Sequence, residues 1–242
     1  MKYFRETALL WAVLILCVGV PPARATIPDE NVGLGIKQTE RAIFPNGVIL
    51  HGIHSGKVRI VVSVDAEGNL VDHLVVSYTN AAFARSAVEA VKAWTYEPAK
   101  VHGQPRASRV DLSFVFKSDL NVTVLNSEVS FLQDIFGETN EFQPSLLRDL
   151  DRIPTPVHVV TPLIPDGVLA LGEERVVTVE FYIDQEGKVR VPAVSREKAD
   201  DRLAAVAVAA VEQWRFEPPM RKKQPVLVLA QQDFRFVAKP KP

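Results

Sequence analysis

The chain carries one ordered set of short motifs twice, and this internal repeat constrains its fold more than any other feature. The segment from Ala90 to Pro98, AVKAWTYEP, returns 120 positions later as AVEQWRFEP, which ends at Pro218. The sequence DAEG that begins at Asp65 returns 119 positions later as DQEG, which begins at Asp184. Two copies whose spacing differs by one residue predict two small tandem domains within the 242 residues, rather than one large domain.

Each segment of the first copy has a recognisable hydrophobic period. Apolar side chains alternate over residues 60–64, which predicts a half-buried strand, and residues 65–69 supply turn chemistry before a second strand over residues 70–77. A helix comes next, capped by Thr79 or Asn80. Its buried stripe is formed by Phe83, Ala87, Val88, Val91 and Trp94. Alternation resumes at Val110, Leu112, Phe114 and Phe116, so the predicted order of elements is β-β-α-β.

The second copy has the same order. Residues 177–195 predict a strand, a turn and a returning strand, and Pro192 within the return indicates an edge strand or a bulge. A helix that begins at Asp200 or Asp201 buries a stripe of Leu203, Ala207, Ala210, Val211 and Trp214, and residues 227–237 close the copy. The predicted fold class is α+β, with two tandem ββαβ units, each a three-stranded antiparallel sheet packed by one main helix.

The N-terminus has the pattern of an export signal. Lys2 and Arg5 precede an apolar run over residues 8–20, which is shorter than the roughly 20 residues that a membrane span needs. A small-x-small cleavage site comes next and ends at Ala25. We therefore expect residues 1–25 to be a signal peptide and the mature chain to lie in the periplasm, whereas an uncut segment would anchor it in the inner membrane. Cys17 lies in this segment, so the mature chain has no cysteine.

The rest of the chain divides into three parts: a first domain over residues 26–117, a connector over residues 118–153 and a second domain over residues 154–242. In the connector, Leu120, Val122 and Val124 alternate like a strand. The apolar residues between positions 131 and 136 predict a short helix. We expect the connector to pack on the first domain, with the true joint near residues 149–156.

Charge and motifs exclude several functional classes. The net charge of -1 argues against a nucleic-acid partner, and no nucleophile motif such as G-x-S-x-G is present. His51 and His54 lack a nearby third ligand for a metal, and two carboxylates in each hairpin turn are too few oxygens for calcium. We expect no catalytic activity, no cofactor, no metal and no small-molecule substrate. The repeated aromatic and proline positions are interpreted as structural core: Trp94, Pro98, Trp214 and Pro218.

The ordered set of motifs resembles the C-terminal domain of TonB-family energy transducers. Phe44-Pro45 and Ile164-Pro165 stand where that family usually has Tyr-Pro, and each copy has the hairpin with Asp-x-x-Gly, the helix ending in Trp-x-Tyr/Phe-x-Pro and the final Phe-x-Phe strand. The resemblance covers roughly residues 43–117 and 156–238. It implies a periplasmic module that binds a short peptide of outer-membrane receptors by adding it as a strand to an exposed sheet edge.

The closing strand of each copy is the binding edge that this resemblance implies, over residues 109–116 and 228–236. In the family, a Gln often stands at this edge four residues before the Pro of Tyr-Pro, where this chain has Arg41 and Thr161. The candidate peptide-binding residues are therefore Arg41, Val110, Leu112, Phe114, Thr161, Val228, Ala230, Gln232 and Phe234. The chain departs from a transducer because no long Pro-rich spacer comes after its apolar run.

Two hypotheses remain open at this point. The first is a peptide-binding envelope protein of TonB type, with outer-membrane TonB-dependent receptors as partners and a role in transmembrane transport. The second is a structural or assembly protein of the cell envelope that uses its tandem domains for scaffolding or for pairing into a homo-dimer. The edges are free in the first case, whereas coverage by residues 120–124 or by the other domain would remove them.

Overall fold

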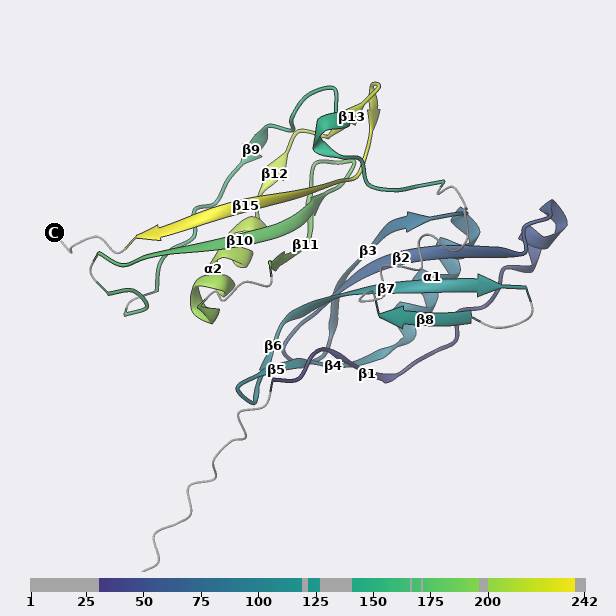
Figure 1. Ribbon diagram of the computed structural model, residues 1–242, viewed down its shortest axis with the longest axis horizontal. Helices are drawn as coiled ribbons and strands as arrows, with labels where there is room; N and C mark the ends of the chain where they lie inside the picture. The colour runs from purple at the N-terminus through teal and green to yellow at the C-terminus, as the bar shows by residue number, and fades with distance from the viewer. Residues whose placement is uncertain are drawn as a thin grey trace, which may run out of the picture.

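The computed structural model describes residues 31–118, 122–126, 141–165, 167–170, 172–195 and 200–237. It contains two ββαβ units side by side, which confirms the predicted fold class (Figure 1). We call residues 31–118 the first copy and residues 145–237 the second copy. The expected signal peptide and the expected short helix over residues 131–136 lie outside the described residues. Within the described part, no helix is long and apolar enough to cross a membrane.

The first copy contributes three strands to an antiparallel sheet with the order β3-β2-β7-β8, and the connector supplies β8, so this sheet has one strand more than predicted. The helix α1 (Ala81–Ala93) joins β3 to the later strands. The sheet strands are β2 (Ser55–Val64), β3 (Leu70–Tyr78), β7 (Ser108–Lys117) and β8 (Val122–Asn126). The smaller elements are β1 (Gly35–Gln38), η1 (Asn46–His51), β4 (Thr95–Glu97), β5 (Ala99–Val101) and β6 (Gln104–Arg106).

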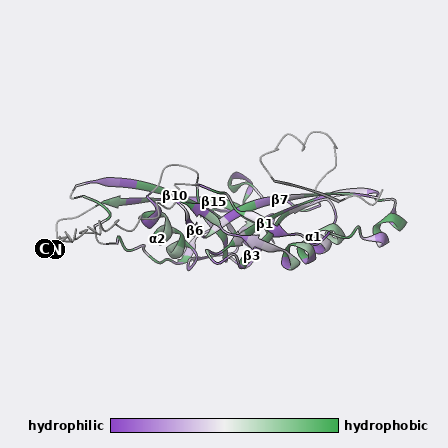
Figure 2. Cartoon of the chain, turned by 90° about the horizontal axis from the view of Figure 1, so that it is seen from below, coloured by the Kyte–Doolittle hydropathy of each residue, from purple (hydrophilic) through white to green (hydrophobic). Residues whose placement is uncertain are grey.

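The second copy has a three-stranded antiparallel sheet with the order β11-β10-β15. Its strands are β10 (Glu174–Ile183), β11 (Val189–Val194) and β15 (Val228–Val237), and its helix is α2 (Asp201–Val211). The smaller elements are η3 (Leu147–Asp149), β9 (Pro156–His158), β12 (Arg215–Phe216), β13 (Met220–Arg221) and β14 (Gln224–Pro225). Figure 2, at right angles to Figure 1, shows an elongated molecule with α1 and α2 on the same, lower side of that view.

Local side-chain chemistry explains where the elements begin and turn. The Asp65 carboxylate accepts hydrogen bonds from the backbone N–H of Asn69 at 2.7 Å and of Glu67 at 3.0 Å, and the Asp184 carboxylate binds its own turn in the same way. The side chains of Asn80 and Asp200 each accept from a backbone N–H in the first turn of the next helix. Both hairpins and both caps therefore confirm the predictions.

The two hydrophobic cores lie between helix and sheet in each copy. Every predicted stripe residue of α2 is buried, and in α1 only Val88 is partly exposed. Trp94 and Trp214 pack at 5.6 Å, centroid to centroid, on Phe114 and Phe234 of the closing strands. The interpretation of both tryptophans as core residues is confirmed, and Pro98 is half-buried. Pro218 is exposed, whereas its neighbour Pro219 is buried, so the interpretation of Pro218 as a core residue is wrong.

A third apolar cluster joins the copies. Val61 points away from the core of its own copy, because its neighbours Ile60 and Val62 belong to that core. Across the junction Val61 shares a cluster with Tyr182 and Val191 of the second copy. The other members are Leu74, Val76 and Leu227, with Phe142 packed against them. The two copies are therefore in direct contact rather than joined only by the connector.

The connector changes sides earlier than predicted. Phe142 exchanges backbone hydrogen bonds with Tyr78 of the first copy, and the two rings stack at 5.3 Å. Three residues later, the N–H of Ser145 donates to the carbonyl of Leu227 in the second copy. The change therefore falls between positions 142 and 145, ahead of the expected joint at residues 149–156, because residues 145–151 pack on the second copy.

Pro192 sits in a bulge of an edge strand, as its position in the sequence predicts. The β10–β11 register shifts between Glu180 and Tyr182, so that two residues of β11 lie opposite one of β10. Val191, the residue before the proline, has φ +41°, which a β-branched residue rarely adopts. Its buried side chain reaches the junction cluster from this bulge. The bulge therefore directs the Val191 side chain of β11 toward the first copy.

Candidate peptide-binding edge

The strand β15 is paired along its whole length on one side. All ten of its residues lie opposite β10, from Val228 opposite Ile183 to Val237 opposite Glu174. On the other side, among the described residues, the only pairing is the bridge between Ser145 and Val228 at the start of the strand. The rest of β15 therefore presents an open edge in the described part of the chain.

The backbone groups that face this open edge can be identified by alternation. The Leu227 carbonyl accepts from Ser145 on the outer side, and in an antiparallel ladder every second residue points its N–H and C=O the same way. On β10, the Thr178 carbonyl accepts from Ser195 of β11, which is consistent with this phase. The outward-facing residues of β15 are therefore Leu229, Gln231, Asp233, Arg235 and Val237.

These outward-facing residues of β15 differ from the peptide-binding residues that the sequence predicted. The predicted residues Val228, Ala230, Gln232 and Phe234 turn their backbone groups toward β10, and Val228, Ala230 and Phe234 pack their side chains into the core beneath the sheet, where Val228 is fully buried. The sequence therefore identified the correct strand, β15, but not the residues whose backbone N–H and C=O groups face the open edge. The interruption of the apolar alternation at Gln231, Gln232 and Asp233 marks the segment correctly, since all three are exposed.

The corresponding edge of the first copy is occupied. β7 pairs with β2 on one side and with β8 on the other, from Leu112 opposite Asn126 to Phe116 opposite Val122. The sequence left open a coverage of this edge by residues 120–124; among the described residues, 122–126 cover it over residues 112–116. Leu112 and Phe114 are fully buried in the core, and Val110 is half-buried ahead of the paired stretch.

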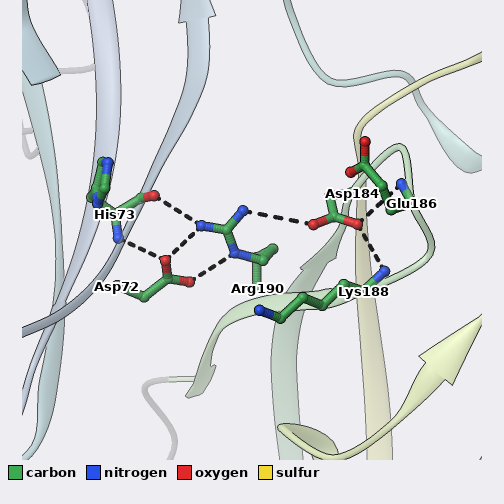
Figure 3. Close-up of polar contacts among 6 residues, drawn as sticks. All are labelled: Asp72, His73, Asp184, Glu186, Lys188 and Arg190. Atoms are coloured by element: carbon green, nitrogen blue, oxygen red, sulfur yellow. Dashed lines mark hydrogen bonds and ion pairs between the residues drawn. The ribbon is translucent and has the colours of Figure 1, made fainter.

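The edge of β11 in the second copy faces the first copy. The Arg190 guanidinium of β11 holds the Asp72 carboxylate of β3 with two bonds of 2.5 and 2.9 Å (Figure 3). It also donates to the His73 carbonyl at 3.0 Å and lies 3.6 Å from the Asp184 carboxylate. These contacts raise the pKa of Arg190, chiefly through its hydrogen bond to Asp72. An extended peptide that paired with the β11 edge would therefore collide with the first copy.

A second arginine crosses the junction in the opposite direction. Arg109 of β7 donates to the Glu180 carboxylate at 2.6 Å and to the Val191 carbonyl at 3.1 Å. Tyr182 lies beside this pair in the junction cluster, and its burial raises the pKa of its phenol. Arg109, expected to lie on a peptide-binding edge, thus binds the second copy and holds the β11 bulge.

Arg41 and Thr161 lie in matching segments that the tryptophans hold. The indole N–H of Trp94 donates to the Glu40 carbonyl at 2.7 Å, and that of Trp214 donates to the Val160 carbonyl at 2.8 Å. Each hydrogen bond fixes the residue just before Arg41 or Thr161, and both of these residues are exposed. Since Trp214 packs on Phe234, the Thr161 segment is tied to β15 through one side chain.

The outward-facing residues of β15 have polar side chains in the middle of the strand and apolar side chains at its ends. Asp233 accepts a hydrogen bond of 2.6 Å from the Thr178 hydroxyl, and Arg235 forms an exposed ion pair of 3.0 Å with Glu174. Leu229 and Val237 are each 38% exposed. Among the described residues, no group of three His, Cys, Asp or Glu side chains could hold a metal ion. The geometry suits backbone pairing, with short apolar contacts near both ends.

Comparison with known families agrees with the two-copy arrangement. Residues 44–118 and residues 162–238 each match the model of the family described as the Gram-negative bacterial TonB protein C-terminal. The two matched segments cover more than half of the chain. No curated protein matches the chain.

Proposed function

The chain belongs to the TonB C-terminal family, and from this premise we propose that it is a non-catalytic periplasmic protein that binds extended peptides on the β15 edge. The partners are envelope proteins, with the N-terminal segments of outer-membrane TonB-dependent receptors as the first candidates. The role is support of TonB-dependent transport.

The observation that carries this proposal is the contrast between the sheet edges. β7 is paired with β8, and β11 lies against the first copy, whereas β15 has an open edge beyond Val228 in the described part. Proteins usually cover or interrupt such an edge because it is a template for pairing with another chain. Of the two closing strands, β7 and β15, only β15 has an open edge in the described part of the chain, which supports peptide binding there.

Strand addition explains how binding proceeds without a catalytic constellation. The outward N–H and C=O groups of Gln231, Asp233 and Arg235 supply a ladder of hydrogen bonds to any extended peptide. Side-chain preference then comes from Leu229 and Val237 near the ends and from the charges of Asp233 and Arg235 between them. The module therefore selects peptides mainly by their ability to lie extended along the edge.

A titration followed by amide NMR tests the proposal. Folded residues 26–242 are titrated with peptides from the N-termini of the host's outer-membrane receptors. We expect shifts concentrated on Leu229, Gln231, Asp233 and Arg235, with little change along β7. An unchanged spectrum at millimolar peptide would contradict the proposal.

A pair of variants at one residue separates backbone pairing from side-chain contact. Gln231→Pro removes an outward N–H while leaving the β10 ladder intact, because proline is tolerated on an edge strand where its N–H faces solvent. Gln231→Ala removes the exposed side chain and keeps the N–H. We expect the proline variant to weaken peptide binding about tenfold, which corresponds to one hydrogen bond, and the alanine variant to bind within about twofold of the parent. Equal losses in both variants would assign binding to the side chain instead.

The alternative function, an assembly protein, would use the same edge in another way. Two molecules that pair their β15 edges would form one continuous sheet and a homo-dimer. Sedimentation at the concentration used for the titration separates the two functions. A monomer that binds peptide supports the receptor-binding proposal, and a stable dimer whose β15 amides are already protected supports assembly.

A further inference from the structure

We propose that β7 is a second peptide-binding edge, which the chain keeps closed with its own strand β8. The inference rests on the proposed function in one respect: it treats β7 and β15 as the same edge in two copies. In this view β8 is a ligand supplied in cis, and an extended peptide gains access to β7 only when β8 leaves. The chain then has one open site and one closed site.

The two edges occupy equivalent places in their copies. β7 pairs with all ten residues of β2, and β15 pairs with all ten residues of β10. The Trp–Phe distance from helix end to closing strand is 5.6 Å in both. The outward phase is also shared, because the N–H of Ser118, the residue after β7, donates to the His54 carbonyl on the β2 side. Alternation from there turns Ser113 and Val115 toward β8, as it turns Asp233 and Arg235 toward solvent.

The second copy shows that a ββαβ unit does not need a fourth strand. Its core is buried between α2 and three strands, with Phe236 3% exposed and Val179 fully buried. β8 is therefore an addition to a unit that is already complete. Its pairing spans five residues of β7, half the length of the β2–β7 ladder. A short terminal ladder of this kind opens by local unfolding while the rest of the domain stays folded.

The sequence of β8 indicates what class of ligand the edge takes. Val122, Thr123 and Val124 are β-branched, the side-chain type that fits a pleated strand best, and no charged residue occurs in VTVLN. Four residues separate β8 from the end of β7, so β8 reaches its edge at a high effective concentration. A peptide in trans must compete with this local strand, which makes β15 the edge that fills first.

A proline substitution in β8 opens the edge for testing. Leu125 lies opposite Ser113, whose backbone groups face β8, so Leu125→Pro removes a donor to β7. Leu125→Ala keeps that donor and serves as the matched control. We expect the Ser113 and Val115 amides to exchange with solvent at least tenfold faster in the proline variant and within about twofold of the parent in the alanine variant.

The probe for the opened edge is a synthetic peptide of residues 120–128 of this chain. When it is added to the Leu125→Pro variant, we expect protection of Ser113 and Val115 to return. Failure of the peptide to restore protection would overturn the inference. Loss of the dispersed resonances of the first copy in the proline variant would also overturn it, because β8 would then be an integral strand.

The outcome of this experiment is independent of the outcome of the titration that tests the proposed function. If the 120–128 peptide protects β7 while receptor peptides leave β15 unchanged, the closed site stands and the receptor role does not. In the unaltered chain, exchange of the Thr123 and Leu125 amides supplies an independent check. We expect them to exchange at least tenfold faster than amides of β2. Exchange at the same rate as β2 would show that β8 opens only by global unfolding, and would contradict the inference.

Discussion

The two copies share their interior and differ at their edges. In both, a tryptophan at the helix end packs on the first phenylalanine of the closing strand and donates its indole N–H to a carbonyl 54 residues upstream. In the first copy the closing strand is covered by β8, whereas in the second copy it is open beyond Val228 in the described part. The repeated residues therefore specify the fold, and pairing outside the repeat decides whether the edge of the closing strand is available.

The same comparison explains why the hairpin and the helix-end motif repeat together. Gly68 and Gly187 have φ +89° and +78°, and a Cβ on either would press on the carbonyl of Tyr96 or Phe216. In the second copy the N–H of Phe216 also donates to the Gly187 carbonyl at 2.8 Å. The Asp-x-x-Gly turn and the Trp-x-Tyr/Phe-x-Pro segment are two sides of one backbone contact. Neither motif needs to contact a ligand to be retained in both copies.

The largest effect is expected from removing either tryptophan. Trp94→Ala and Trp214→Ala each lose a buried ring and one hydrogen bond, at a cost of about 3–5 kcal/mol in the free energy of unfolding. Chemical denaturation measures this, with the remaining tryptophan reporting on the other copy. Trp214→Ala should abolish peptide binding, whereas Trp94→Ala should leave it if the second copy stays folded. Retained binding in Trp214→Ala would show that the first copy is the binding copy.

The next effect comes from the two turn glycines. Gly68→Ala should cost about 1–2 kcal/mol in the free energy of unfolding, because alanine disfavours a left-handed backbone. Gly187→Ala should cost more, since the added Cβ would overlap the Phe216 carbonyl more severely than Gly68→Ala overlaps the Tyr96 carbonyl. Thermal unfolding of the two variants tests this order. Equal costs would mean that β12 moves away freely and that the contact in the second copy is loose.

The junction between the copies is tested at Arg190. Arg190→Ala leaves Asp72 without its bidentate partner at a site where both side chains are about a quarter exposed, so we expect a loss of about 1–2 kcal/mol. Arg235→Ala removes an ion pair that is much more exposed and should cost less than about 0.5 kcal/mol. Denaturation followed separately in each copy should show the two transitions moving apart in Arg190→Ala only. Coincident transitions would indicate that the apolar cluster alone couples the copies.

A smaller difference concerns Tyr96, which corresponds to Phe216 in the second copy. The Tyr96 hydroxyl donates to the Val91 carbonyl at 2.8 Å, and burial raises its pKa to about 12. Tyr96→Phe makes the first copy resemble the second and should cost about 1 kcal/mol in the free energy of unfolding. Urea denaturation measures the change. A neutral outcome would show that water satisfies the Val91 carbonyl.

The smallest predicted effect depends on pH. Asp151 accepts hydrogen bonds from the backbone N–H groups of Lys223 and Lys222, both at 2.8 Å, which lower its pKa below the ordinary 3.8. A depressed folded pKa contributes stability above pH 3.8 that is lost as the pH falls through the lowered value. In the first copy the equivalent acceptor is the amide of Asn31, which binds the His102 N–H and does not titrate. Amide shifts of Lys222 and Lys223 should therefore change in acid in the parent and stay constant in Asp151→Asn.

The sequence predicts the elements well because their signals are local. The Asp65 and Asp184 turns, the helix caps at Asn80 and Asp200, and the bulge at Pro192 each result from side chains within a few positions. The residues involved at the edges are harder to predict, because pairing depends on which strand comes to lie alongside. The phase of β15 is set by its long-range pairing with β10, and the closure of β7 depends on a connector strand whose sequence does not show which edge it pairs with.

The polar contacts at the junction between the copies had no signal in the sequence. Arg190, Asp72 and Arg109 have the pattern of ordinary alternating polar residues in half-buried strands, and only the folded chain brings them within hydrogen-bond distance of their partners. Val61 is the one residue whose position indicates a second buried face. It is apolar where the alternating strand would have a polar residue, so residues 60–64 are all apolar or small. Interfaces between domains use long-range contacts that no local period encodes.

Hydrogen exchange of the outward amides on the two closing strands tests the central claim most directly. In the free protein, Ser113 and Val115 should exchange slowly because they pair with β8, and their equivalents Asp233 and Arg235 should exchange quickly. Addition of a receptor peptide should slow Asp233 and Arg235 and leave Ser113 and Val115 unchanged. Equal protection of both pairs in the free monomer, or no change at Asp233 and Arg235 with saturating peptide, would contradict an open second edge that binds by strand addition.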